Sequence, residues 1–118
     1  MKYKGFVQGI ELKVLVGIHA WERKAAQPVL MDVEYEVDSK RAIQTDDVQD
    51  TLNYEAMVNH LKMVAEHTQY QLIESLGHHL VSEVEAHFPV LWLRIRLAKI
   101  SVIECAQACG IEIERRYD

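Results

Sequence analysis

Residues 29–38, VLMDVEYEVD, alternate between apolar and mostly acidic side chains with a period of two. The apolar row consists of Val29, Met31, Val33, Tyr35 and Val37, and the other row consists of Leu30, Asp32, Glu34, Glu36 and Asp38. Successive side chains of a strand point to opposite faces, so this segment predicts a strand with one buried and one solvated face. Such a strand is typical of an antiparallel sheet that is covered on one side only.

Similar patterns predict the remaining elements. Residues 6–16 and 91–97 are expected to be strands with every second residue buried, and residues 110–116 form a last strand. Asn53 is a plausible N-cap for a helix that begins at Tyr54. A second helix has an apolar stripe through Leu76 and Leu80 and ends before Pro89.

The predicted order is ββααββ, with no linker and no repeat. At 118 residues the chain is expected to be one domain, residues 1–118. Two helices can cover the apolar face of one four-stranded antiparallel sheet, which gives an α+β domain. The open edges of such a sheet need protection, and closing several sheets into a ring of subunits would supply it.

Composition excludes several classes of protein. The net charge is −5 and no basic stripe interleaved with aromatic residues occurs, so nucleic-acid binding is not expected. No signal peptide or membrane span is recognisable, which makes the cytoplasm the expected compartment. Cys105 and Cys109 have no histidine nearby and are expected to be free thiols. His60 and His67 have no partner at ligand spacing, so no metal site is predicted.

Lys99 occupies an unexpected place in the segment LRIRLAK, residues 93–99. It continues the apolar row of Leu93, Ile95 and Leu97. One interpretation is a strand that ends at Leu97, with the lysine bending out to solvent. The other is a desolvated lysine at a site, where such a side chain can act as a general base.

Three further residues lie, like Lys99, at the ends of predicted elements, where functional sites usually form. They are Glu22 in the first loop, Tyr54 at the start of the first helix and Glu74 near the start of the second. Taken singly, each also has a structural explanation. Glu22 could be a solvated loop charge, Tyr54 a core aromatic, and Glu74 a carboxylate that favours a helix N-terminus.

Taken together, these residues lie in segments that resemble the dihydroneopterin aldolase family. The segments are GIHAWE, DDVQDTLNYE, YQLIESL, LRIRLAK and GIEIER, in this order and over nearly the whole chain. The resemblance implies the tunnelling fold, in which sheets of four ββααββ subunits close a barrel and two such rings usually form an octamer. It also implies sites between neighbouring subunits.

The resemblance further implies residue roles. Glu74 would anchor the pterin, beside Leu72 and Ile73. Lys99 would be the acid/base group, and Glu22 would lie near the substrate side chain. Tyr54, next to Asn53, would come from the adjacent subunit. A carboxylate can accept two parallel N–H donors from a pterin. The C6=N5 imine of a dihydropterin can take the electrons of the broken C1′–C2′ bond, so no cofactor, Schiff base or metal is required.

Three functions remain open from the sequence. The first is the aldolase, which releases glycolaldehyde from 7,8-dihydroneopterin. The second is a dihydroneopterin triphosphate 2′-epimerase, because Ile100 follows Lys99 where many aldolases have proline, and Arg23 and Lys24 could bind a triphosphate. The third is a non-catalytic pterin- or purine-binding protein of the same fold.

Overall fold

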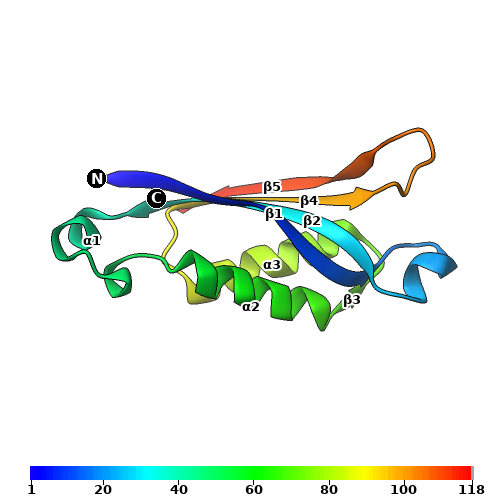
Figure 1. Cartoon of the computed structure of the whole chain (residues 1–118), viewed down its shortest axis with the longest axis horizontal. Helices are drawn as coiled ribbons and strands as arrows, with labels where there is room; N and C mark the ends of the chain where they lie inside the picture. Colours follow the sequence, from blue (N-terminus) through cyan, green and yellow to red (C-terminus); the bar gives the residue numbers. More distant parts are fainter. Residues whose placement is uncertain (118) are drawn as a thin grey trace.

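The computed structural model describes residues 1–117 as one sheet with helices on one of its sides (Figure 1). The elements in chain order are β1 (Lys2–Val16), η1 (Ala20–Arg23), β2 (Gln27–Asp38), α1 (Lys40–Thr45), η2 (Val48–Asp50), α2 (Tyr54–Glu66), β3 (Gln69–Tyr70), α3 (Ile73–His87), β4 (Trp92–Ile100) and β5 (Ala108–Arg116). Among these residues, no helix is both long and apolar enough to cross a membrane.

The sheet has the strand order β3-β1-β2-β4-β5. The pairs β1–β2, β2–β4 and β4–β5 are antiparallel, which confirms the predicted four-stranded sheet. The two-residue strand β3 adds a fifth, parallel strand beside the end of β1. It was not predicted, and neither were the short helices α1, η1 and η2, because elements of two to six residues are too short to show a periodic pattern.

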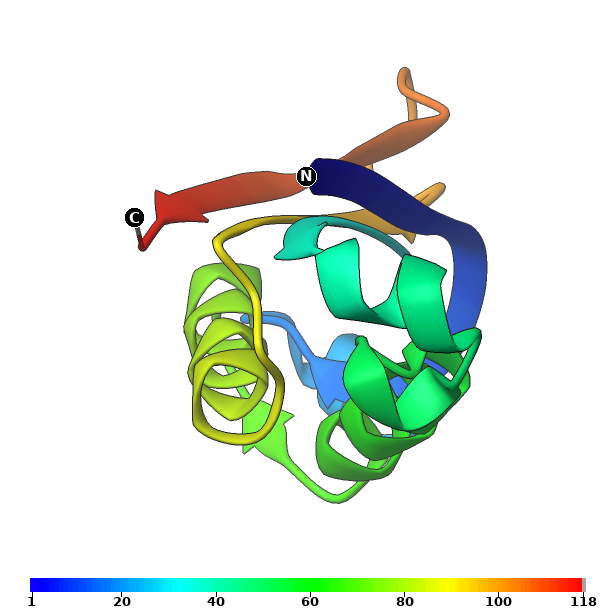
Figure 2. The ribbon, with the colours of Figure 1, turned by 90° about the vertical axis from the view of Figure 1, so that its left-hand side faces the viewer.

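Helices α2 and α3 cover one face of the sheet, and both lie on the same side of it when the molecule is viewed end-on (Figure 2). The alternation in β2 is confirmed except at one position: its apolar row is 0–6% exposed, but Glu36, which was predicted to face solvent, is only 8% exposed. The helices contribute Met57, Leu61, Leu76, Leu80 and Val84 to the same core, and Leu76 and Leu80 belong to the stripe predicted for the second helix. The apolar face of the sheet therefore has its partner within the chain.

Strand β1 begins earlier than predicted and contains a β-bulge. Val7 lies opposite Val33 and Ile10 lies opposite Met31, so β1 holds one residue more than β2 between these pairs. Gly9 has a φ of 73°, and its N–H donates to an Asp32 carboxylate oxygen at 2.7 Å. The bulge changes which residues face the core, and this hid the first part of the strand from a simple period-two pattern.

The other face of the sheet carries a ladder of opposite charges. Arg94 lies between Glu34 and Glu114 in register and contacts both carboxylates. Arg96 lies opposite Glu112 in register, and its Nη1 is 3.9 Å from Oε1 of Glu112. These pairs are partly exposed, so they contribute little stability each. They give the uncovered face of the sheet a strongly polar character.

Candidate functional site

Lys99 is part of a strand and does not bend out to solvent. Strand β4 continues to Ile100, and Lys99 pairs with Val29 on one side and Cys109 on the other. Its side chain is 11% exposed, and its Nζ donates to Oε2 of Glu22 at 2.8 Å. The interpretation of Lys99 as a frayed strand end is therefore wrong. A lysine buried to this degree needs a charged partner, and Glu22 provides it.

Glu22 is 2% exposed, so the interpretation as a solvated loop charge is also wrong. The short helix η1 presents it, and the backbone N–H of His19 donates to its Oε1 at 3.3 Å. Gly17 precedes this turn with a φ of 148°, a conformation that favours glycine. A Cβ on Gly17 would also lie 2.4 Å from the Glu22 carboxyl carbon. The absence of a side chain at Gly17 thus makes room for the carboxylate.

Two more residues hold this end of the sheet together. The Gln27 side-chain amide donates to the Val16 carbonyl at 2.9 Å, which joins the two ends of the η1 loop. Gly110 lets β5 approach β4 closely, because a Cβ there would lie 1.8 Å from the Leu97 carbonyl oxygen. The sequence analysis missed both residues. A glycine inside a predicted strand signals such a close approach, whereas nothing in the sequence singles out Gln27.

Opposing effects act on the pKa of Glu22. Burial alone would raise it, but the hydrogen bond from Lys99, the His19 N–H and the positive charge of Lys99 together lower it. The net direction is downward, so Glu22 is a carboxylate throughout the neutral range. It can therefore stabilise a positive charge on Lys99 in a place from which water is largely excluded.

The start of α3 lies at this same end of the molecule. The Gly17 N–H donates to the Tyr70 carbonyl at 3.2 Å, which fixes β3, and hence the beginning of α3, beside the η1 loop. Leu72, just before the helix, is 49% exposed, whereas Ile73 packs partly against the core. Glu74 is exposed and makes no hydrogen bond or ion pair with any other described residue. Both of its oxygens are thus free to accept donors from a ligand.

Tyr54 and Asn53 lie at the opposite end. Asn53 caps α2 as predicted, because its side chain accepts the Ala56 N–H at 3.1 Å. Tyr54 is 60% exposed, so the interpretation as a buried core aromatic is wrong. It lies close enough to Tyr35 to raise the pKa of that phenol, although burial is the larger cause.

The separation of the two groups follows from the register of β2. Tyr35 lies six residues further along this strand than Val29, the partner of Lys99. Six residues of strand span about 20 Å. Within one chain, the end of β4 and the start of α3 therefore lie toward one end of the sheet, and the start of α2 lies toward the other (Figure 1).

Comparison with known proteins identifies the family. The family model for dihydroneopterin aldolase matches residues 5–114. The chain belongs to the dihydroneopterin aldolase family. It is 27% identical to dihydroneopterin aldolase of Escherichia coli K12 over 110 residues, which cover 93% of this chain and 90% of the relative. The predicted subunit of the tunnelling fold is confirmed, since the crystal structure of the E. coli enzyme in complex with neopterin superposes with a TM-score of 0.91.

The superposition on the E. coli enzyme covers 96% of this chain and 98% of the E. coli chain, and the two sequences are 26% identical. The chain is also similar in sequence to dihydroneopterin triphosphate 2′-epimerase of E. coli K12. It is 19% identical over 107 residues, which cover 91% of this chain and 89% of the relative. The sequence is thus more similar to the E. coli aldolase than to the E. coli epimerase.

The lowered pKa of Glu22 predicts a specific dependence of stability on pH. A carboxyl group with a depressed pKa in the folded state stabilises that state above its unfolded pKa of about 4.3. This contribution is lost as the pH falls through the folded value. We expect Glu22→Gln to lower the free energy of unfolding at pH 7, and we expect the difference from the wild type to shrink markedly at pH 3.

Urea unfolding at a fixed protein concentration measures this difference. Glu11→Gln is the matched control, because Glu11 is exposed on β1 and is 57% accessible. Its difference from the wild type is expected to stay small at both pH values. An equal loss for Glu22→Gln at pH 7 and pH 3 would show that the charge of Glu22 does not stabilise the fold.

Proposed function

We propose that this protein is a dihydroneopterin aldolase, which cleaves 7,8-dihydroneopterin into 6-hydroxymethyl-7,8-dihydropterin and glycolaldehyde. The observation that carries this proposal is the Lys99–Glu22 pair, with Nζ and Oε2 only 2.8 Å apart at a buried strand end. Family membership supports it, as does the neopterin bound by the similar E. coli enzyme. The joint presence of Glu22, Tyr54, Glu74 and Lys99 argues against a protein that only binds a ligand.

Glu74 anchors the pterin in this proposal. Its free carboxylate accepts the two parallel N–H groups of the pterin 2-amino group and N3, in the same fork geometry that carboxylates use with arginine. Leu72 and Ile73 lie just before Glu74 and contact the substrate from the start of α3. Asn53, beside Tyr54, contributes to binding from the neighbouring subunit.

The reaction then needs one base and one acid. Lys99, once its ammonium has released a proton to solvent, takes the proton of the 2′-hydroxyl, directly or through a water molecule. The O–H electrons form the carbonyl of glycolaldehyde, and the electrons of the C1′–C2′ bond pass into the conjugated C6=N5 imine. Tyr54 helps to return a proton to C1′. The carboxylate of Glu22 stabilises the ammonium that Lys99 becomes when it accepts the proton.

This arrangement requires at least two copies of the chain, because Tyr54 interacts with Tyr35, which lies about six strand residues, or roughly 20 Å, from the β2 partner of Lys99. A ring of four subunits, alone or stacked as an octamer, supplies Tyr54 from the adjacent chain. It also covers the outer edge of β5, which has no partner strand among the described residues. The charge ladder on the uncovered sheet face then lines a wet tunnel.

The second candidate is the triphosphate epimerase, which shares the first half of this chemistry. Arg23 and Lys24 are exposed beside the buried Glu22 and could bind a triphosphate. Incubation with dihydroneopterin and with its triphosphate distinguishes the two functions. Release of glycolaldehyde from dihydroneopterin supports the aldolase, whereas epimerised triphosphate without cleavage supports the epimerase.

If Lys99 is the general base, Lys99→Ala should keep the fold and the affinity for a pterin but lose most of the cleavage rate. General acid–base catalysis typically contributes about 10²–10⁴-fold, so a fall of that size is expected. Glycolaldehyde formation measures the rate, and circular dichroism checks the fold. Lys62→Ala, on the exposed side of α2, is the matched control. A rate within threefold of wild type for Lys99→Ala would remove Lys99 from the mechanism.

Glu74→Gln should weaken pterin binding while it leaves stability unchanged. The amide keeps the shape of the side chain but replaces one acceptor oxygen with a donor, so the fork onto two N–H groups is lost. Loss of a charged hydrogen-bonding partner in a desolvated site costs about 2–4 kcal/mol. Calorimetry with 6-hydroxymethylpterin measures the affinity, with Glu11→Gln as the control. Unchanged affinity would mean that Glu74 only favours the start of α3.

A further inference from the structure

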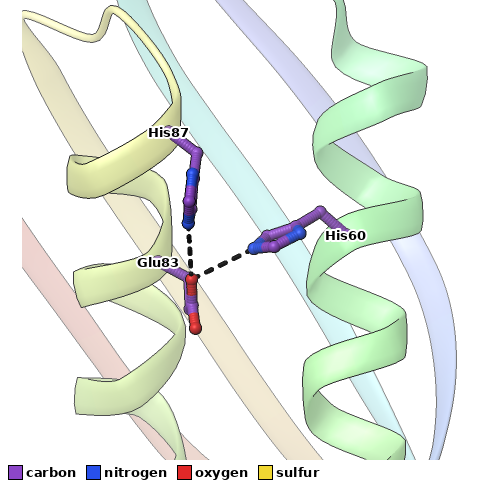
Figure 3. Close-up of side chains that lie close together, drawn as sticks. All are labelled: His60, Glu83 and His87. Atoms are coloured by element: carbon purple, nitrogen blue, oxygen red, sulfur yellow. Dashed lines mark hydrogen bonds and ion pairs between the residues drawn. The ribbon is translucent and has the colours of Figure 1, made fainter.

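A cluster of imidazoles and one carboxylate lies between α2 and α3, apart from the proposed active site (Figure 3). His60 of α2 and His87 of α3 both point at Glu83 of α3. Their Nε2 atoms lie 3.1 Å and 3.2 Å from the same carboxylate oxygen, Oε2. One ligand atom from each of the three residues lies within 4.8 Å of the other two.

Helix geometry and helix packing create this cluster together. Glu83 and His87 are four residues apart on α3 and therefore lie on the same face. His60 comes from α2, which packs against α3, and is 23 residues away from Glu83 in the sequence. No metal site was predicted from the sequence, because only pairs of histidines were considered. The Glu83–His87 spacing was missed, and the approach of His60 depends on helix packing that no local pattern shows.

His79 completes the surroundings of Glu83. Its Nε2 lies 3.4 Å from the other carboxylate oxygen, Oε1, and its Nδ1 lies 3.0 Å from the Tyr70 hydroxyl. With the tyrosine donating to Nδ1, the Nε2–H of His79 is directed at Glu83. Contacts of this kind orient the carboxylate ligands of metal ions in proteins.

The charge of Glu83 suits a cation. Its carboxylate faces three imidazoles, with His60 and His87 at Oε2 and His79 at Oε1. His60 and Glu83 are about one-quarter exposed and His87 is 54% exposed, so an ion can enter from solvent.

We propose that His60, Glu83 and His87 bind one divalent transition-metal ion of the zinc type. Two imidazole nitrogens and a carboxylate oxygen suit Zn²⁺ or Co²⁺, whereas Mg²⁺ and Ca²⁺ prefer oxygen ligands. Ligands at about 2.0–2.1 Å from a tetrahedral Zn²⁺ lie about 3.3 Å from one another. The distances from Glu83 Oε2 to the Nε2 atoms of His60 and His87, 3.1 Å and 3.2 Å, are close to this separation between ligand atoms. A water molecule would occupy the fourth coordination position.

The ion would have a structural role. Glu83 lies nine residues beyond Glu74 on α3, which is about 13 Å along a helix. An ion there does not reach a pterin held at Glu74. It would instead tie α2 to α3, the helices whose first turns carry Tyr54 and Glu74. Because the ion binds the folded state, it should raise the thermal stability of the chain.

Titration of the untagged, chelator-treated full-length protein with Co²⁺ tests the proposal. We expect saturation at one equivalent per chain, with the intense visible absorption of a four- or five-coordinate site. Zn²⁺ should displace the Co²⁺ and raise the melting temperature. His60→Gln and His87→Gln should each weaken binding at least tenfold. His67→Gln is the matched control, because His67 directly follows α2 and its side chain, among the described residues, hydrogen-bonds to the Met63 carbonyl alone.

Each contrary result would overturn the proposal. No Co²⁺ or Zn²⁺ binding at 100-fold excess would show a metal-free cluster, in which His87 near the end of α3 simply pairs with Glu83. Equal binding by His60→Gln, His87→Gln and wild type would place the ion elsewhere on the surface. Equal loss of binding in His67→Gln would point to a general effect on the fold. A melting temperature measured without metal checks that each variant is folded.

Discussion

The arrangement of the loop and strand ends at this end of the molecule depends on the ion pair between Lys99 and Glu22. Both side chains are almost fully withdrawn from water, at 11% and 2% exposure. Leaving one partner of such a pair unpaired typically costs about 3–5 kcal/mol, so the surrounding backbone must hold both with little freedom. Gly17 provides the space for the carboxylate, and Gln27 closes the loop that carries it.

The fold places the other functional candidates by the same strand register. Val29 and Tyr35 lie six residues apart on β2, with Lys99 beside the first and Tyr54 near the second. A monomer cannot bring these two groups together without breaking the sheet. Their separation therefore makes assembly a condition for the proposed chemistry. It also explains how a chain of 118 residues can build a site that it does not enclose by itself.

Much of this was predictable from the sequence, and the failures have physical causes. Period-two alternation identified β2 and placed Lys99 in the apolar row of β4, and Asn53 signalled the start of α2, because these features are local. The Lys99–Glu22 contact joins residues 77 apart in sequence, so no local pattern predicts it. The β-bulge at Gly9 reversed the alternation in β1 and concealed its first residues. The approach of His60 to Glu83 likewise depends on how two helices pack.

The most direct test of the account is complementation between two inactive variants. Lys99→Ala chains and Tyr54→Phe chains are unfolded, mixed in equal amounts and refolded together, and glycolaldehyde release from dihydroneopterin is measured. If each site takes Lys99 from one chain and Tyr54 from its neighbour, random assembly regenerates about a quarter of the wild-type sites. The account predicts that the mixture recovers about that fraction of the wild-type rate, far above either variant refolded alone. A mixture no more active than the mean of the two variants would contradict a site shared between subunits.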